Sequence, residues 1–124
     1  MKTILIVEDE QAIAEMLAAI LVEADYRVVI AGDGQEALTK LETASPDLIL
    51  SDIMMPIMDG RALSRKLQAH PTYRLIPTVL MSAAYDSIRL SDGSPARFLR
   101  KPFELEELLD MLSDILGEGE ETEG

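Results

Sequence analysis

Hydrophobic residues in this chain occur either in short continuous runs or at intervals of three to four positions. Runs predict strands and intervals predict helices. Four largely apolar runs of four to six residues have the length of buried strands, and Arg-Phe-Leu-Arg at 97–100 is expected to form a short fifth strand. The segments between most of these runs carry apolar residues three or four positions apart, which is the spacing of one helix face. The last and clearest helical stripe ends at Gly117, a residue type that commonly follows a helix. The predicted strands span residues 2–7, 26–31, 48–51, 77–82 and 97–100.

Strands that alternate with helices predict a parallel α/β sheet with right-handed connections. Five such strands in so short a chain fit a flavodoxin-like, doubly wound five-stranded sheet, with strand order 2-1-3-4-5 and helices on both faces. One connection departs from this pattern. Ser91, Asp92, Gly93, Ser94 and Pro95 stand where a crossover helix is expected, and these residue types favour turns. We therefore expect the fourth helix to be truncated or irregular.

Composition narrows the class of protein. The chain has 124 residues, 48% of them hydrophobic, and is expected to form one domain at residues 1–117 followed by an acidic, disordered tail at 118–124. The absence of cysteine excludes disulfides, thiol catalysis and zinc–thiolate sites. The single histidine, His70, precedes a proline at a predicted helix end, where we expect a surface role rather than a catalytic one.

Charge and hydropathy restrict the expected partners and location. The net charge of −12 argues against direct binding to nucleic acid, which requires clustered Lys and Arg, but it leaves divalent cations open as ligands. The N-terminal apolar run stops at Glu8, too early for a signal peptide or a membrane span. We expect a soluble, cytoplasmic protein without membrane contact.

Polar side chains that could bind a metal or take part in a reaction stand at the carboxyl ends of the predicted strands. Glu8 and Asp9 follow the first strand and Asp52 the third, while Ser82 ends the fourth and Lys101 follows the fifth. Since the first and third strands are neighbours in a doubly wound sheet, the three carboxylates are expected to converge. Such a cluster favours a hard divalent cation, Mg²⁺, with oxygen ligands. A carboxylate beside Mg²⁺, an ammonium and a hydroxyl is suited to attack phosphorus and hold an aspartyl phosphate.

At this point the sequence resembles the receiver domain of a two-component response regulator, of the stand-alone, chemotaxis-receiver type. The resemblance covers the chain from Met1 to about Leu116. Each motif is weak by itself, but their order and spacing, including the thirty positions from Asp52 to Ser82, are jointly specific. The motifs are Val-Glu-Asp-Glu at 7–10, Asp52 with Met55-Pro56 and Met58-Asp59-Gly60, Ser82-Ala83, and Lys101-Pro102-Phe103.

The resemblance implies a phosphorylation-dependent signalling switch. Asp52 would accept a phosphoryl group from a histidine kinase, from a phosphotransfer protein in a phosphorelay, or from a small phosphodonor. Asp9 and Asp52 would bind Mg²⁺ together with the backbone carbonyl of Met54, and Glu8 would act on the metal through water. The chain would catalyse its own phosphorylation and slow dephosphorylation, with no turnover on an external substrate.

The resemblance also implies how the phosphoryl group would be read. Lys101 would contact a phosphoryl oxygen, and the Lys101–Pro102 bond is expected to be cis. Ser82 would turn to bond the phosphoryl group and Phe98 would follow it inward, so these two residues form the expected switch. The face from the fourth strand to the last helix would then bind an unknown downstream effector or, as an alternative, a second copy of the chain. Met54 and Ala84, which cannot hydrogen-bond water through their side chains, predict slow dephosphorylation.

Three other functions remain to be weighed. A phosphate-independent interaction module on the same fold is disfavoured because Asp9, Asp52 and Lys101 are all retained. A phosphatase with an aspartyl nucleophile would need an acid two positions later, where Met54 stands. A flavin-binding protein would need a phosphate-binding loop after the first strand, where Glu8, Asp9 and Glu10 would repel phosphate.

Overall fold

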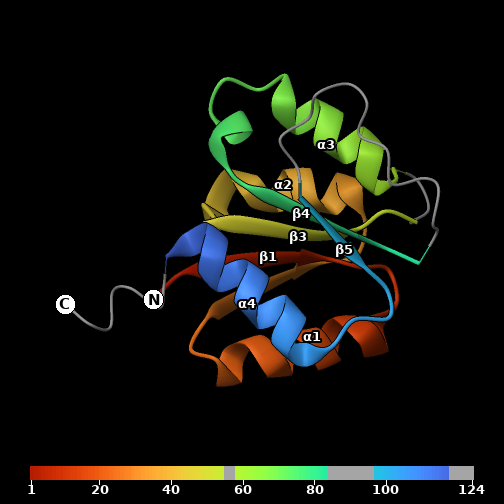
Figure 1. Cartoon of the computed structure of the whole chain (residues 1–124). Helices are drawn as coiled ribbons and strands as arrows, with labels where there is room; N and C mark the ends of the chain where they lie inside the picture. Colours follow the sequence, from red (N-terminus) through yellow and green to blue (C-terminus); the bar gives the residue numbers. More distant parts are fainter. Residues whose placement is uncertain (55–57, 84–96, 118–124) are drawn as a thin grey trace.

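The computed structural model describes residues 1–54, 58–83 and 97–117. Five parallel strands form one sheet in the order β2-β1-β3-β4-β5, which confirms the predicted doubly wound, flavodoxin-like topology (Figure 1). Asp52 lies inside the third strand as its last residue, one position further than the predicted strand end. The strands are β1 (Thr3–Val7), β2 (Arg27–Ala31), β3 (Leu48–Asp52), β4 (Thr78–Ser82) and β5 (Arg97–Arg100).

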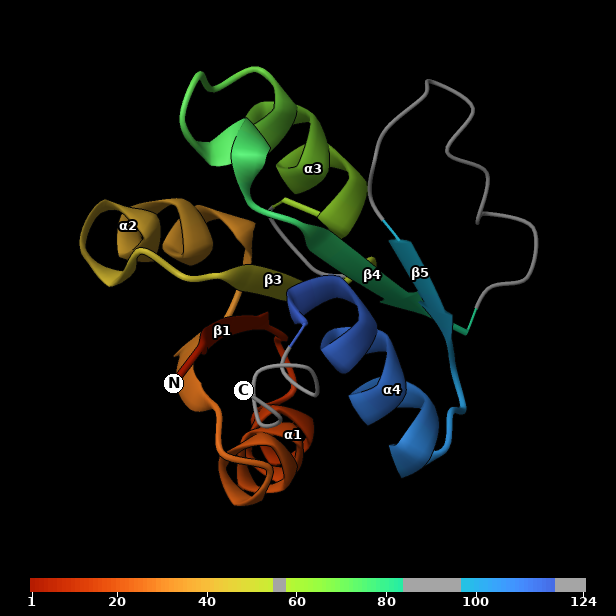
Figure 2. The same cartoon turned by 60° about the vertical axis from the view of Figure 1, so that its left-hand side comes forward.

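Helices cover both faces of this sheet. Figure 1 shows α2 and α3 on one face and α1 and α4 on the other, and Figure 2 shows the same two layers after a turn of 60°. Every residue of β1, β3 and β4 is buried, because these strands are interior and have helices on both sides. The helices are α1 (Gln11–Glu23), α2 (Gly34–Ala44), α3 (Gly60–Gln68) and α4 (Leu105–Leu116), with a short 3₁₀ turn, η1 (Tyr73–Leu75).

The alternation of side chains along the strands divides the core into two clusters. Ile4 and Ile6 on β1 pack in the cluster beneath α1 and α4, whereas Leu5 and Val7 belong to the cluster beneath α2 and α3. This period of two along a strand is why continuous apolar runs, rather than alternating ones, indicated strands buried on both faces.

Local residue chemistry fixes the ends of three helices. The Asp33 carboxylate accepts a hydrogen bond from the Glu36 N–H at 2.8 Å and begins α2. Asp59 caps α3 in the same way, accepting from the Ala62 N–H at 2.8 Å. Gly117 ends α4 with a positive φ of 70°, as the sequence predicted.

Two predictions fall on residues outside the described ranges. These are the irregular fourth helix, within residues 84–96, and the acidic tail at 118–124. Within the ranges that are described, no helix has the length and apolar character needed to cross a membrane.

Candidate functional site

The acidic residues predicted to converge do so at the carboxyl edge of the sheet. Glu8 and Asp9 follow β1 directly, and Asp52 ends the neighbouring strand β3. Each of the three offers a carboxylate oxygen, and these oxygens lie within 4.8 Å of one another. The three side chains, predicted from topology alone, therefore form one cluster.

Lys101 completes the cluster from the end of β5. Its Nζ lies 3.3 Å from Oδ1 of Asp52 and 3.8 Å from Oε1 of Glu8, so one ammonium contacts both buried carboxylates. The Lys101–Pro102 peptide bond is cis, as the resemblance implied. One ammonium faces three carboxylates, which leaves two negative charges uncompensated when all four groups are ionised.

Backbone hydrogen bonds to adjacent strands hold Glu8, Lys101 and the chain just after Asp52 in place. The Glu8 N–H donates to the Ala31 carbonyl at 3.0 Å, which fixes the chain leaving β1 against β2. The Ile53 N–H donates to the Met81 carbonyl at 3.0 Å, and the Lys101 N–H donates to the Ser82 carbonyl at 2.9 Å. The strand ends, rather than mobile side-chain contacts, therefore set the positions of the acidic residues and the lysine.

Burial disfavours the ionised form of two of the three carboxylates. Glu8 is 2% exposed and Asp52 is 7% exposed, whereas Asp9 is exposed. Desolvation raises the pKa of Glu8, and the nearby Asp52 charge adds to the rise while the Glu10 N–H and Lys101 oppose it. Desolvation likewise raises the pKa of Asp52, with Lys101 acting in the opposite direction.

The donor set fits a divalent cation. Oε2 of Glu8 accepts from the Glu10 N–H at 3.2 Å, but Oε1 is buried without a hydrogen-bond partner among the described residues. Within the described ranges this oxygen has only the Lys101 ammonium at 3.8 Å and lies inside a cluster with excess negative charge, so it can act on a cation. Oxygen ligands of this kind suit Mg²⁺, which commonly keeps several waters and uses one or two carboxylates.

Gly60 forms a close backbone contact beneath the cluster that the sequence did not reveal. A Cβ at this position would lie 2.6 Å from the Asp52 carbonyl oxygen and 2.8 Å from Cα of Ile53. The Gly60 N–H also donates to the Ile53 carbonyl at 2.9 Å. The first residue of α3 therefore packs directly against the end of β3, and the Asp-Gly pair at 59–60 was the only sequence signal for this contact.

The remaining predicted site residues lie around the cluster. Ser82 is buried at the end of β4, next to the strand that carries Asp52. Phe98 is partly buried on β5, opposite Leu80 of β4. Met54 lies two residues beyond Asp52 and is 68% exposed, which leaves its side chain in solvent. Met55 and Pro56, part of the motif after Asp52, are outside the described residues.

A doubly wound sheet with an acidic cluster and a lysine at its carboxyl edge defines an α/β protein whose candidate site lies at the strand ends, where ligands bind in such sheets. The comparisons are more specific. A family model described as response regulator receiver domain matches residues 4–113. Response regulator ArlR of Staphylococcus aureus (strain NCTC 8325 / PS 47) is 36% identical over 116 residues, which cover 94% of this chain and 53% of that protein. The chain belongs to the response regulator receiver domain family, and it spans about half the length of the curated relatives it matches.

Solved structures agree with this assignment. The signal receiver domain of a histidine kinase from Syntrophus aciditrophicus is 38% identical with a TM-score of 0.87, and the match covers 94% of this chain and 91% of that one. The receiver domain of sensor histidine kinase PA1611 from Pseudomonas aeruginosa PAO1 is 28% identical with a TM-score of 0.80, covering 94% and 98%. The latter is described with a magnesium ion coordinated in its active site cleft.

Proposed function

We propose that the chain is a phosphorylation-dependent signalling switch in which Asp52 accepts a phosphoryl group from a histidine kinase, a phosphotransfer protein or a small phosphodonor. One observation carries this proposal. The Asp52 carboxylate, at the end of β3, lies 3.3 Å from the Lys101 ammonium and in one cluster with two further carboxylates. Such an arrangement offers a nucleophile, a cation for the transferred phosphoryl group and a binding site for a metal.

In the proposed reaction an Asp52 carboxylate oxygen forms a bond to phosphorus while the bond from phosphorus to the donor breaks. The donor leaves with the electron pair of that bond, and Asp52 becomes an acyl phosphate. Lys101 moves from its contact with Asp52 toward a phosphoryl oxygen. Asp9, Asp52 and the Met54 carbonyl would hold Mg²⁺, with Glu8 acting through water. Bound Mg²⁺ would supply neutralisation of the charge on the phosphoryl oxygens.

The proposed readout uses Ser82 and Phe98. Ser82 ends β4 between the strands that carry Asp52 and Lys101, so its hydroxyl is close in the sheet to the group that would be modified. Phe98 lies one strand further and half-buried, a position from which an inward turn would change the surface of β5. The partner would be an effector protein or a second copy of the chain, and residues 1–117 would act as the signalling unit.

Intact-mass analysis with acetyl phosphate and Mg²⁺ tests the proposal. We expect one added phosphoryl group on the wild type and none on Asp52→Asn. Asp110→Asn, on the exposed face of α4, is the matched control and should be modified like the wild type. A folded wild type that gains no phosphoryl group with Mg²⁺ present would favour the phosphate-independent interaction module. Modification of Asp52→Asn would place the acceptor elsewhere.

A further inference from the structure

Basic residues are concentrated on one part of this acidic protein. Four of the eleven Lys and Arg residues lie between Gly60 and Pro77, a stretch that contains no Asp or Glu. Three of them, Arg65, Lys66 and Arg74, are exposed, and none forms an ion pair with another described residue. A chain with a net charge of −12 thus carries an uncompensated positive surface on the second half of α3 and on η1.

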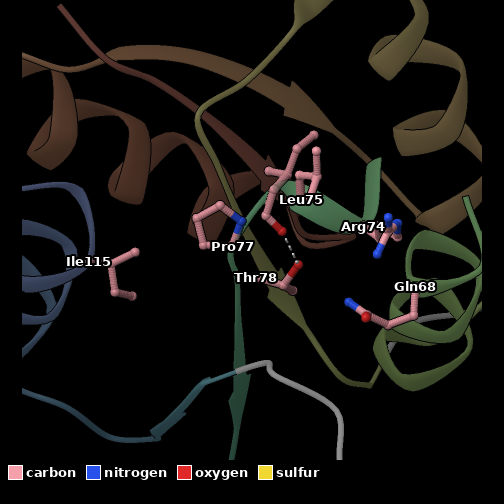
Figure 3. A pocket seen from close by; sticks show the side chains of 7 residues that line it. Gln68, Arg74, Leu75, Pro77, Thr78 and Ile115 are labelled. Carbon is pink, nitrogen blue, oxygen red and sulfur yellow. Dashed lines mark hydrogen bonds between the residues drawn. The ribbon is translucent and has the colours of Figure 1, made fainter. Parts of the chain in front are cut away.

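A cavity of about 340 Å³ adjoins this positive surface at Arg74, the one of the three exposed basic residues that lines it. Figure 3 shows Gln68 and Arg74 on one side of it and Pro77 and Ile115 on the other. Leu75 also lines the cavity and is 72% exposed, so it presents apolar surface at the cavity edge. The cavity is therefore largely apolar with an arginine at its edge. It lies at the amino end of β4, at the opposite end of the sheet from Asp52.

The two features together select one kind of ligand. Carboxylates would pair with Arg65, Lys66 and Arg74, and an apolar side chain between them would fill the cavity next to Leu75. Nucleic acid fits less well, because its regularly spaced phosphates offer nothing to an apolar cavity and the rest of the chain repels a polyanion. An acidic protein segment with one apolar anchor satisfies both features.

We propose that this α3–η1 surface, formed by Arg65, Lys66, Arg74, Leu75 and the adjoining cavity, binds an acidic segment of a partner protein through an apolar side chain flanked by carboxylates. The surface is separate from the Asp52 cluster, which lies beyond the other end of α3. Binding here does not require phosphorylation of Asp52, so the inference stands or falls independently of the proposed function.

Nuclear magnetic resonance titration of the full, ¹⁵N-labelled chain tests this surface. The probe is the blocked peptide Glu-Glu-Leu-Glu-Glu, with Glu-Glu-Ala-Glu-Glu as the probe of equal charge without the anchor. We expect saturable amide shifts confined to residues 64–78 and the last turn of α4. The alanine peptide should bind about fivefold more weakly, because it buries less apolar surface in the cavity.

Charge-reversed variants identify the contact. Arg74→Glu and Lys66→Glu should each weaken binding of the leucine peptide about two- to fivefold, the range expected for exposed ion pairs. Arg27→Glu, a matched change at an exposed position on β2, should leave the affinity unchanged, and circular dichroism confirms that each variant is folded. The proposal is overturned by the absence of saturable shifts at these amides or by equal weakening in Arg27→Glu. Tighter binding of a single-stranded oligonucleotide at the same amides would also overturn it.

Discussion

Replacing Gly60 with alanine should disturb the end of β3, because the added methyl group would meet the backbone of that strand. The new Cβ would lie 2.6 Å from the Asp52 carbonyl oxygen, and backbone atoms cannot rotate away as a side chain can. Overpacking of this kind costs about 1–3 kcal/mol, and weakening the hydrogen bond from Gly60 to Ile53 adds roughly 0.5–1.5 kcal/mol. Alanine recovers about 1 kcal/mol through its higher helix propensity. We therefore expect Gly60→Ala to lower the free energy of unfolding by about 0.5–3.5 kcal/mol.

Gly34→Ala is the matched control, because it also adds a methyl group at the start of a helix. There the new Cβ would meet only the side chain of Met58, at 2.9–3.0 Å, and a methionine side chain can adjust. We expect this variant to lie within about 1 kcal/mol of the wild type. Urea unfolding followed by far-ultraviolet circular dichroism measures both variants.

The same pair of variants tests whether the contact positions Asp52. Displacing the end of β3 should weaken Mg²⁺ binding about tenfold in Gly60→Ala, an effect comparable to losing a supporting contact around a metal site. Mg²⁺ affinity, measured by calorimetry on folded protein, should be unchanged in Gly34→Ala. Wild-type stability together with wild-type Mg²⁺ affinity in Gly60→Ala would refute the reasoning.

Four further changes have defined outcomes. His70 Nδ1 accepts from the Thr72 and Tyr73 N–H groups, both at 3.1 Å, so His70→Ala should lose about 0.5–2 kcal/mol of unfolding free energy, and His70→Asn, which keeps an acceptor, should lose less. Asp9→Asn should reduce the rise in melting temperature that Mg²⁺ gives the wild type, as a thermal melt with and without the metal would show. Met54→Asn should speed loss of the phosphoryl group from Asp52, measured by intact mass over time, because an amide can position water where the exposed methionine cannot. Burial raises the pKa of Asp52, so in Mg²⁺-free solution Asp52→Asn should be more stable than the wild type at neutral pH, and urea unfolding should show this advantage shrinking as the pH falls toward the ordinary carboxyl range.

The sequence predicted the fold best at the strands that are covered by helices on both faces. The runs that became β1, β3 and β4 are largely apolar because both faces of each strand are covered, and the end of the third run placed Asp52 at the edge of the sheet where ligands bind in such folds. Adjacent residues were harder to separate. Glu8 is buried and Asp9 exposed, a difference set by the path of the chain leaving β1 rather than by residue type. The contact of Gly60 with β3 joins two backbones, so no side-chain pattern could report it.

Backbone hydrogen bonds hold the acidic cluster together against the repulsion between its carboxylates. Lys101 contacts Asp52 and Glu8, but a single ammonium cannot neutralise three carboxylates, two of which are buried. Burial raises the pKa of Glu8 and of Asp52, and a neighbouring carboxylate adds to the rise in each case, so these charges favour separation or protonation. Hydrogen bonds from Glu8 to β2, from Ile53 to β4 and from Lys101 to β4 prevent the separation. The stability of the sheet thus maintains an excess of negative charge that a divalent cation can neutralise, and in the proposed function that cation would stand beside Asp52 before a phosphodonor arrives.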